Sequence, residues 1–184
     1  MRIISGKYRG HKLVAFDAAN IRPTTDRVKE DIFNLMAMYV DGAKVLDLFS
    51  GTGSLGLEAL SRGCEHVDFV DSHIKSIQIL KENIHKLKVP AESYKIIKSD
   101  ALKFIQKNPI DYDLILIDPP FTKTMADEVM TALGQADLGP FKFICIESTK
   151  HEKIEDQYGD VIRLYKRKSY GDKHLSVYKH KEDL

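Results

Sequence analysis

Between residues 44 and 146, short apolar runs alternate with segments whose apolar residues recur at the spacing of an amphipathic helix. The short runs have the length of buried strands, and the periodic segments have the length of helices. Strands that alternate with helices predict a parallel sheet covered on both faces. The expected strands are 45–49, 67–70, 94–97, 114–117 and 141–146, and the expected helices are 55–60, 74–87, 101–106 and 125–133.

Both ends of the chain depart from this alternation. Residues 2–4 and 11–15 predict a short basic β-hairpin, and a helix is expected to start at Pro23 and to reach Tyr39. Residues 161–168 and 175–179 flank a Gly-Asp pair and predict an antiparallel hairpin. We therefore expect an α/β fold with a seven-stranded, mostly parallel sheet that ends in an antiparallel hairpin. Residues 1–184 are expected to form one domain, with 1–40 as an extension and 41–184 as a Rossmann-like core.

A glycine-rich loop follows the first expected strand. The run DLFSGTGSLG, residues 47–56, places Gly51, Gly53 and Gly56 between a strand and a helix, where a nucleotide cofactor can approach the backbone. Asp47 separates the possible cofactors, because a carboxylate beside this loop would repel a pyrophosphate. It would attract the ammonium group of an amino acid, such as the methionine end of S-adenosylmethionine. The alternative is a purely structural strand-to-helix turn.

Further acids follow the next two expected strands. Asp71 can accept hydrogen bonds from both ribose hydroxyls of a cofactor, or it can cap the next helix together with Ser72. Asp100, followed by Ala101, can accept an adenine amino group or can serve only as a helix cap. The candidate cofactor-binding residues on these strand ends are therefore Asp47, Phe49, Gly51, Thr52, Gly53, Asp71, Ser72, Asp100 and Ala101.

The run Asp118-Pro119-Pro120-Phe121 follows the strand expected at 114–117. Two prolines fix the backbone and remove two amide donors, so that carbonyls can face a cleft. The Asp118 carboxylate and the Pro119 carbonyl can hold the hydrogens of an aromatic amine, which favours a pyramidal nitrogen whose lone pair faces a methyl donor. Phe121 offers a face on which a base can stack. The run therefore predicts methylation of an exocyclic base amine; a rigid loop with a solvent-facing acid is the alternative.

The net charge of +1 conceals an uneven distribution. Residues 1–29 carry +5 and residues 161–181 carry +6, whereas residues 30–160 carry −8. Basic ends on an acidic middle suit a rim that contacts phosphates around a cofactor-binding core, although the charges can also lie on ordinary solvated faces. The candidate RNA-binding residues are Arg2, Lys7, Arg9, Lys12, Arg22 and Arg27.

Composition narrows the class of protein further. No apolar run is long enough to cross a membrane, and the first residues lack the pattern of a signal peptide. Cys64 and Cys145 lie far apart in apolar settings, which suits a reducing cytoplasm, and no spacing typical of metal ligands occurs. We expect a cytoplasmic protein that binds no metal and no membrane, and a monomer.

Four motifs occur in order over nearly the whole chain: RIIxGxYRG from residue 2, RPTTDRV from residue 22, DLFSGTG from residue 47 and DPPF from residue 118. Together they resemble the bacterial RsmD family of 16S ribosomal RNA guanine-N2 methyltransferases. The first two motifs separate this family from generic DNA amino-methyltransferases. Two features depart from it: Asp71 stands where the family often has Glu, and the basic tail follows no family pattern.

This resemblance implies an S-adenosylmethionine-dependent, Rossmann-like methyltransferase fold. It also implies methylation of N2 of one guanine, position 966 in the usual rRNA count, within the small ribosomal subunit or its assembly intermediate. Residues 118–121 would form the catalytic loop. The segment from Arg22 to Arg27 would lie near the methionine end of the cofactor and the target base. Thr24 and Thr25 are therefore added to the cofactor-binding residues, although they can instead cap the following helix.

Three other functions remain as alternatives. A DNA adenine or cytosine amino-methyltransferase could carry the same catalytic loop, but the chain has no insertion long enough for a DNA target-recognition domain. A non-catalytic RNA-binding assembly factor would not need the intact run from Asp118 to Phe121. An oxidoreductase that uses NAD is disfavoured by Asp47.

Overall fold

The computed structural model describes residues 1–16, 26–120, 122 and 124–184, and it contains one sheet of eight strands. Five strands are parallel: β1 (Lys44–Leu48), β2 (His66–Asp71), β3 (Tyr94–Lys98), β4 (Leu114–Ile117) and β5 (Phe143–Thr149). The helices between them are α3 (Ser54–Ser61), α4 (Ile74–Leu87), α5 (Ala101–Lys107) and α6 (Met125–Gln135), with a 3-10 turn η1 (Ala91–Ser93) before β3. The predicted alternation of strands and helices is confirmed.

The strand order is β3-β2-β1-β4-β5-β8-β7-β6. Strands β2 and β3 are therefore added on one side of β1 and the later strands on the other side, so that the order of the strands reverses between β1 and β4. In open sheets of this kind, ligands bind outside the carboxyl ends of the strands at such a reversal. The predicted glycine loop follows β1, and the predicted Asp-Pro-Pro run follows β4. The topology therefore brings the two strongest sequence motifs to the same end of two neighbouring strands.

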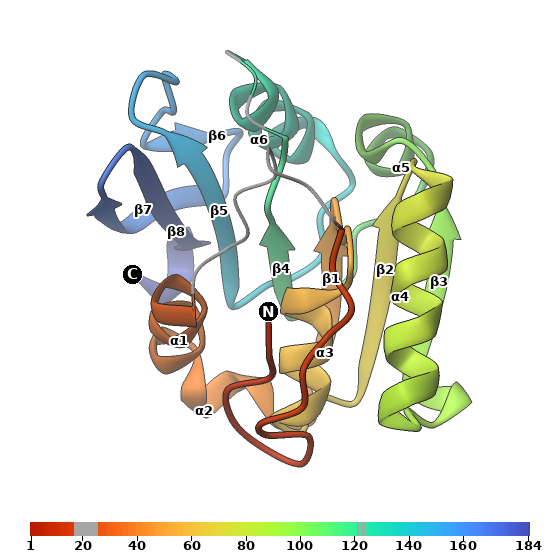
Figure 1. Ribbon diagram of the computed structural model, residues 1–184. Coiled ribbons are helices and arrows are strands. Elements are labelled where there is room, and N and C mark those ends of the chain that lie inside the picture. Colours follow the sequence, from red (N-terminus) through yellow and green to blue (C-terminus); the bar gives the residue numbers. More distant parts are fainter. Residues whose placement is uncertain (17–25, 121, 123) are drawn as a thin grey trace.

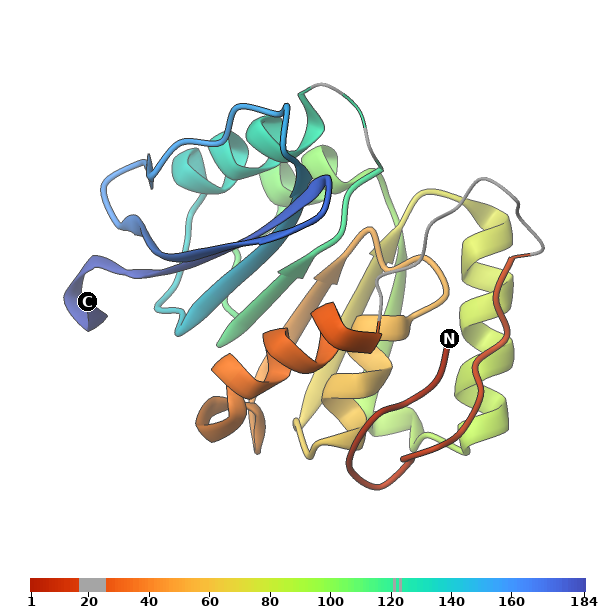
Figure 2. The same cartoon turned by 60° about the vertical axis from the view of Figure 1, so that its left-hand side comes forward.

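The sheet lies between two layers of helices (Figures 1 and 2), and α1, α3 and α4 cover one face while α5 and α6 cover the other. Each face has its own buried core. Val45 and Phe69 belong to the core under α3 and α4, and Leu46 and Val70 belong to the core under α5 and α6. Side chains alternate between the two faces of a strand, so both faces of the central strands must be apolar.

The antiparallel end of the sheet consists of β6 (Gln157–Tyr158), β7 (Ile162–Tyr170) and β8 (Lys173–His180), followed by a 3-10 turn η2 (Lys181–Asp183). The predicted hairpin is confirmed as β7 and β8, and β8 inserts between β5 and β7. The two-residue strand β6 makes eight strands where seven were expected. The position of β6 follows from Tyr158, whose buried side chain donates a hydrogen bond of 2.6 Å to Asp127 at the start of α6.

The predicted N-terminal hairpin is present as a turn with one antiparallel bridge, and not as a pair of regular strands. Residues 1–13 do fold back on themselves, but only a single bridge joins Arg2 to Lys12. The backbone N–H groups of Ile4 and Ser5 do not pair within the segment. They donate to the Glu58 carboxylate of α3 at 2.9 and 3.0 Å. The segment is therefore held by α3 as well as by its own hydrogen bonds, such as that from Ile3 N–H to the His11 carbonyl at 3.0 Å.

The helix expected from Pro23 is present in part. Residues 17–25, which include its predicted start, lie outside the described residues. The described part forms α1 (Asp26–Leu35) and a short α2 (Ala37–Val40), separated at Met36. Ile32, Phe33 and Met36 are fully buried and attach these helices to the core under α3. Among the described residues, no helix is long and apolar enough to cross a membrane.

Candidate cofactor and catalytic site

A cavity of about 410 Å³ lies at the carboxyl ends of β1, β2 and β4. Four carboxylates from four different strand ends line it, namely those of Asp47, Asp71, Asp100 and Asp118. These are the four acids that the sequence predicted for the site. The remaining lining residues are Met1, Ala15, Phe16, Phe49, Ser50, Gly51, Thr52, Ser54, Leu55, Ser72, His73, Ser76, Pro120 and Met125.

The glycine loop forms a tight, closely packed floor for this cavity. Ser50 N–H donates to the Val70 carbonyl at 3.0 Å, and Gly53 N–H donates to the Ser50 carbonyl at 2.7 Å. Gly53 has φ of 85°, and a Cβ there would lie 2.4 Å from Leu80 Cδ1. A Cβ on Gly56 would lie 2.3 Å from Phe69 Cε1. Glycine is therefore needed at both positions for packing and at Gly53 also for the backbone conformation.

Asp47 is buried at the bottom of the cavity, with 1% of its surface exposed. Its Oδ2 accepts a hydrogen bond of 2.9 Å from Gly56 N–H. Burial is the main cause that raises the pKa of Asp47 to about 8; the Gly56 hydrogen bond lowers this pKa, and the charges of Asp118 and Asp71 add to its rise. A cation in the cavity would favour the ionised carboxylate. The site is therefore built to gain from an ammonium group.

Ser50 adds a second polar group beside Asp47. Its Oγ is buried and has no hydrogen-bond partner among the described residues. A buried hydroxyl without a partner loses the free energy of one hydrogen bond, which a polar ligand in the cavity can restore. Sequence reasoning did not single out Ser50, although it lies within the glycine motif.

Asp71 joins the end of β2 to the glycine loop. Its Oδ2 accepts a hydrogen bond from Gly51 N–H at 2.8 Å, and its Oδ1 accepts one from His73 N–H at 2.7 Å. Each carboxylate oxygen can accept more than one hydrogen bond, so both oxygens retain capacity for a ligand. Ser72, next to it, is exposed and lines the cavity.

Asp100 is the N-cap of α5, as one of the two sequence interpretations held, and its Oδ1 accepts from Lys103 N–H at 3.0 Å. Its side chain also lines the cavity, so capping does not exclude a contact with a ligand. Ala101, the first residue of α5, is buried and is not among the residues that line the cavity.

The Asp-Pro-Pro run leaves β4 at the edge of the same cavity. Asp118 is half-buried and lines the cavity together with Pro120, whereas Pro119 is buried and does not. Phe121, the residue expected to stack on a base, lies outside the described residues. Asp118 is close enough to Asp47 for its charge to raise the pKa of Asp47.

The N-terminal segment closes one side of the cavity, which the sequence did not predict. Met1, Ala15 and Phe16 line the cavity. Asn83, buried on the apolar face of α4, connects this segment to the glycine loop. Its Nδ2 donates to the carbonyls of Thr52 and Val14, both at 3.0 Å, and its Oδ1 accepts from Val14 N–H at 2.7 Å. A polar residue among Ile77, Leu80, Ile84 and Leu87 was the signal that could have revealed it.

The remaining predicted site residues are spread over the surface or lie outside the described residues. Arg22, Thr24 and Thr25 fall in the second group. Arg2, Lys7, Arg9, Lys12 and Arg27 are exposed. Arg2 is paired with Asp26 at 2.8 Å, and Lys7 lies beside the far end of α3, where its N–H donates to the Ser61 carbonyl. Four of these cations therefore lie along the N-terminal segment and Arg27 lies on α1, and none of the five lines the cavity.

No group of three or more histidine, cysteine, aspartate or glutamate side chains is arranged to hold a metal ion in the described part of the chain. Cys64 and Cys145 are free and buried, and burial raises the pKa of each thiol to about 12. At neutral pH both are therefore thiols rather than thiolates, and neither lines the cavity.

The family described as Conserved hypothetical protein 95 matches residues 1–179. The chain belongs to this family. It is 37% identical to "Putative rRNA methyltransferase YlbH" of Bacillus subtilis, with 97% of this chain and 98% of the relative covered. It is 33% identical to "Ribosomal RNA small subunit methyltransferase D" of Escherichia coli, with 94% and 92% covered.

A solved structure described as "Putative methyltransferase yhhF from Escherichia coli" superposes with a TM-score of 0.86 at 31% identity, and it covers 98% of this chain and 97% of that one. The family resemblance inferred from the four motifs is confirmed. The predicted Rossmann-like methyltransferase fold is confirmed as well.

Proposed function

We propose that the protein transfers a methyl group from S-adenosylmethionine to the exocyclic N2 of one guanine of 16S rRNA. The observation that carries this is the meeting of the glycine loop, its buried acid and the Asp-Pro-Pro run around one cavity. The relatives that match nearly the whole chain are named as rRNA methyltransferases. The finer assignment, guanine 966 in the small ribosomal subunit or its assembly intermediate, follows the RsmD family.

The cavity fits the cofactor in the positions where polar groups are needed. Asp47 and the Ser50 hydroxyl would hold the ammonium and carboxylate end, because one is a buried acid and the other a buried donor without a partner among the described residues. Asp71 would accept from the ribose hydroxyls and Asp100 from the adenine amino group. Phe49, Gly51, Thr52, Gly53 and Ser72 would complete this binding site. When bound, S-adenosylmethionine supplies a methyl group already activated by its sulfonium.

Asp118 would orient the target amine. The lone pair of an aromatic amine is delocalised into the ring, so the nitrogen attacks only when its hydrogens are held out of the base plane. The Asp118 carboxylate and the Pro119 carbonyl are the acceptors for those hydrogens, and Phe121 is the expected stacking partner. Such positioning and electrostatic stabilisation can account for most of the rate enhancement. A base inside paired RNA must first be flipped out of its helix.

The proposal also covers the residues that contact RNA, the oligomeric state and the location of the protein. The exposed cations Arg2, Lys7, Arg9, Lys12 and Arg27, with Arg22, would contact rRNA phosphates. We assign residues 1–184 to one domain that acts as a monomer in the cytoplasm. Thr24 and Thr25 would lie beside the methionine end of the cofactor.

Transfer of labelled methyl from S-adenosylmethionine tests the proposed function, with small ribosomal subunits, naked 16S rRNA and duplex DNA as parallel substrates. We expect label in rRNA, and digestion followed by mass spectrometry should locate it on one N2-methylguanine. Label only in DNA would identify a DNA amino-methyltransferase instead. Cofactor binding without transfer to any of the three substrates would favour a non-catalytic assembly factor.

Asp118→Asn provides the matched variant, since it keeps the shape of the side chain and removes its charge. We expect turnover to fall by about 10²- to 10³-fold, as for the loss of one transition-state contact, while cofactor affinity measured by calorimetry changes by only a few fold. Turnover equal to that of the unaltered protein would show that Asp118 does not orient the amine.

A further inference from the structure

A groove of about 710 Å³ lies between α4 and the edge strand β3, away from the cofactor cavity. Four of its eight lining residues carry basic side chains, namely Lys81, His85, Lys88 and Lys95, and all four are exposed. None of the lining residues is acidic. Over the described part of the chain, no carboxylate lies within ion-pair distance of these four groups. The groove thus gathers basic groups that the fold itself does not neutralise.

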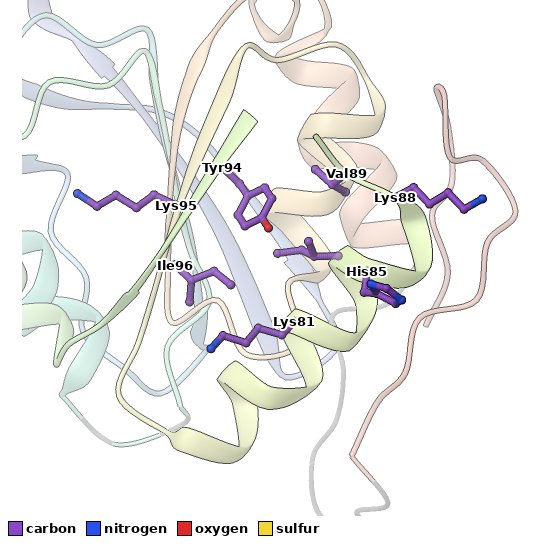
Figure 3. Close-up of a pocket in the computed structure, with 8 residues that line it drawn as sticks. Lys81, His85, Lys88, Val89, Tyr94, Lys95 and Ile96 are labelled. Carbon is purple, nitrogen blue, oxygen red and sulfur yellow. The ribbon is translucent and has the colours of Figure 1, made fainter. Parts of the chain in front are cut away.

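The basic groups are spread along the groove rather than gathered at one point (Figure 3). Tyr94 and Ile96 extend from β3 toward α4, and Lys81 reaches from α4 toward β3. Lys88 points to the opposite side of α4, and Lys95 to the opposite side of β3. Lys81 and His85 are four residues apart and share one face of α4, whereas Lys88 is the C-cap residue that follows the helix. This arrangement suits a polymer with repeated negative charges better than a single small anion.

The floor between the basic groups is apolar and aromatic. Ile84 and Val89 are buried, and Tyr94 is half-buried with its ring at the groove. An aromatic face beside cations is typical of surfaces that bind nucleic acid, where a base stacks while the backbone follows the positive charge. A lysine on an edge strand also prevents sheets from pairing edge to edge. That role explains Lys95 but not Lys81 and His85 of α4 or Lys88 at its C-cap.

The helix that lines the groove also contacts the basic N-terminal segment. Lys86 of α4 donates a hydrogen bond of 2.7 Å to the Lys12 carbonyl, so the segment that carries Arg9 and Lys12 lies against the same helix. At its other end α4 reaches the cofactor cavity through Ser76. Lys81 lies about 7 Å and Lys88 about 18 Å along the helix from Ser76. The target amine is proposed at Asp118 after β4, which β2 and β1 separate from β3. RNA in the groove would therefore be held outside the catalytic cavity, at a distance from the target nucleotide.

We propose that the groove between α4 and β3 binds the phosphate backbone of the rRNA substrate outside the catalytic cavity. This inference rests on the proposed function, because it takes rRNA as the substrate. The groove would add RNA affinity without contributing to the methyl-transfer step.

Two triple variants with the same loss of charge test this proposal. The groove variant carries Lys81→Gln, Lys88→Gln and Lys95→Gln, and the control carries Lys103→Gln, Lys107→Gln and Lys150→Gln, which alter three exposed lysines outside the groove. The dissociation constant for naked 16S rRNA is measured over a series of salt concentrations. We expect the groove variant to bind at least about tenfold more weakly at low salt, with a salt slope smaller by about 2, and the control to change by less than about threefold.

A charge-conserving triple, with Lys81, Lys88 and Lys95 each replaced by Arg, should restore the affinity and the salt slope. Equal affinity and slope in the groove variant and the control would overturn the proposal. So would weaker binding to whole small subunits with unchanged binding to naked 16S rRNA, because the groove would then contact a ribosomal protein.

The outcomes separate this inference from the proposed function. If the groove variant loses rRNA affinity while the unaltered protein transfers no methyl to rRNA, the proposed function fails and the groove assignment stands. If methyl transfer to rRNA occurs with the same KM in the groove variant and the control, the groove assignment fails and the proposed function stands. Cofactor affinity measured by calorimetry should be the same in all variants.

Discussion

At the scale of single residues, Asp47 links the cofactor site to pH. Its pKa is about 8 in the folded protein, raised chiefly by burial, and about 3.9 in an unfolded chain. Between these values the folded chain holds a proton that the unfolded chain has released. The contribution of Asp47 to the free energy of unfolding therefore falls as pH rises from about 4 to about 8, and is constant above that range.

Asp47→Asn should remove this dependence, since an amide oxygen can still accept the Gly56 hydrogen bond. We expect the melting temperature of the cofactor-free variant to rise relative to the original protein as pH increases from 5 to 9. Thermal unfolding at several pH values, monitored by circular dichroism, measures this. A difference in melting temperature that stays constant over the range would contradict the assigned pKa shift.

The same residue should release a proton when the cofactor binds. At pH 7 a group with a pKa of about 8 is mostly protonated, and the ammonium group of S-adenosylmethionine would favour its ionised form. Calorimetric titrations at pH 7 in buffers of different ionisation enthalpy report the number of protons released. We expect net release in the original protein and little or none in Asp47→Asn; equal release in both would place the titrating group elsewhere.

Gly56 shows how closely the cofactor loop is packed. Gly→Ala inside a helix usually stabilises a protein by up to about 1 kcal/mol. Here the added methyl would lie 2.3 Å from Phe69 Cε1 and 2.8 Å from Asp47 Oδ2, so α3 would have to move away from β2. We expect Gly56→Ala to lower stability by about 1–3 kcal/mol, as measured by urea unfolding, and to weaken cofactor binding. A more stable variant would show that α3 can shift freely.

At the scale of elements, Glu58 on α3 connects three parts of the chain. Its carboxylate accepts hydrogen bonds from the backbone N–H groups of Ile4 and Ser5 and lies 2.8 Å from Arg62 Nε and 3.2 Å from Lys29 Nζ. Glu58 and Lys29 are both almost completely buried. The pKa of Lys29 is lowered by burial, which the nearby Glu58 charge partly opposes. The N-terminal segment and α1 thus share one buried anchor.

Removing the two partners of this pair should have unequal effects. Glu58→Ala leaves the buried Lys29 ammonium unpaired and frees two backbone donors, so we expect a loss of about 3–5 kcal/mol. In Lys29→Met, Glu58 still pairs with Arg62 and still accepts from both backbone N–H groups. The loss of unfolding free energy should therefore be clearly smaller. Urea unfolding of the two variants measures the difference, and equal losses would show that Glu58 contributes no more to the anchor than Lys29 does.

The same anchor explains which elements the sequence could and could not predict. The bounds of α4 and β4 were predicted to the residue, because an apolar stripe or an uninterrupted apolar run marks each of them locally. The N-terminal segment has a strand-like sequence, but its partners are Glu58 and Asn83, more than 50 residues away. Strand β6 has only two residues and no periodicity to detect. A local sequence pattern cannot predict hydrogen bonds between residues that are so far apart in the chain.

At the scale of the whole molecule, the basic rim is divided between paired and unpaired groups. Arg2 is paired with Asp26, whereas Lys7, Arg9 and Lys12 are exposed and form no ion pair among the described residues. Charge alone had placed all four in one RNA-binding patch. Their contributions to phosphate binding should therefore differ.

We expect Lys7→Gln, Arg9→Gln and Lys12→Gln together to weaken rRNA binding and to reduce its salt slope by about 2, and Arg2→Gln alone to have a smaller effect than any one of them. Binding measured over a series of salt concentrations tests this. An unchanged slope in the triple variant would remove the N-terminal segment from the RNA-binding surface.

The candidate site was predictable to the extent that its chemistry lies at strand ends. Asp47, Asp71, Asp100 and Asp118 each follow a strand, and the parallel topology brings them to one cavity. The wall formed by Met1 and Phe16 was not predictable, because it depends on how the N-terminal segment folds back over α3 and α4. The unpaired hydroxyl of Ser50 is visible only once its neighbours are placed.

The insertion of β8 between β5 and β7 also sets an order for biosynthesis. Strand β5 ends at Thr149, and its neighbour β8 begins only at Lys173. At about 5–20 residues per second, the ribosome needs about 1–5 s to add the residues between them. Throughout that interval β5 presents an apolar edge to which another chain could pair. Protection of the nascent chain, by a chaperone or by the ribosome surface, therefore matters most just after β5 emerges.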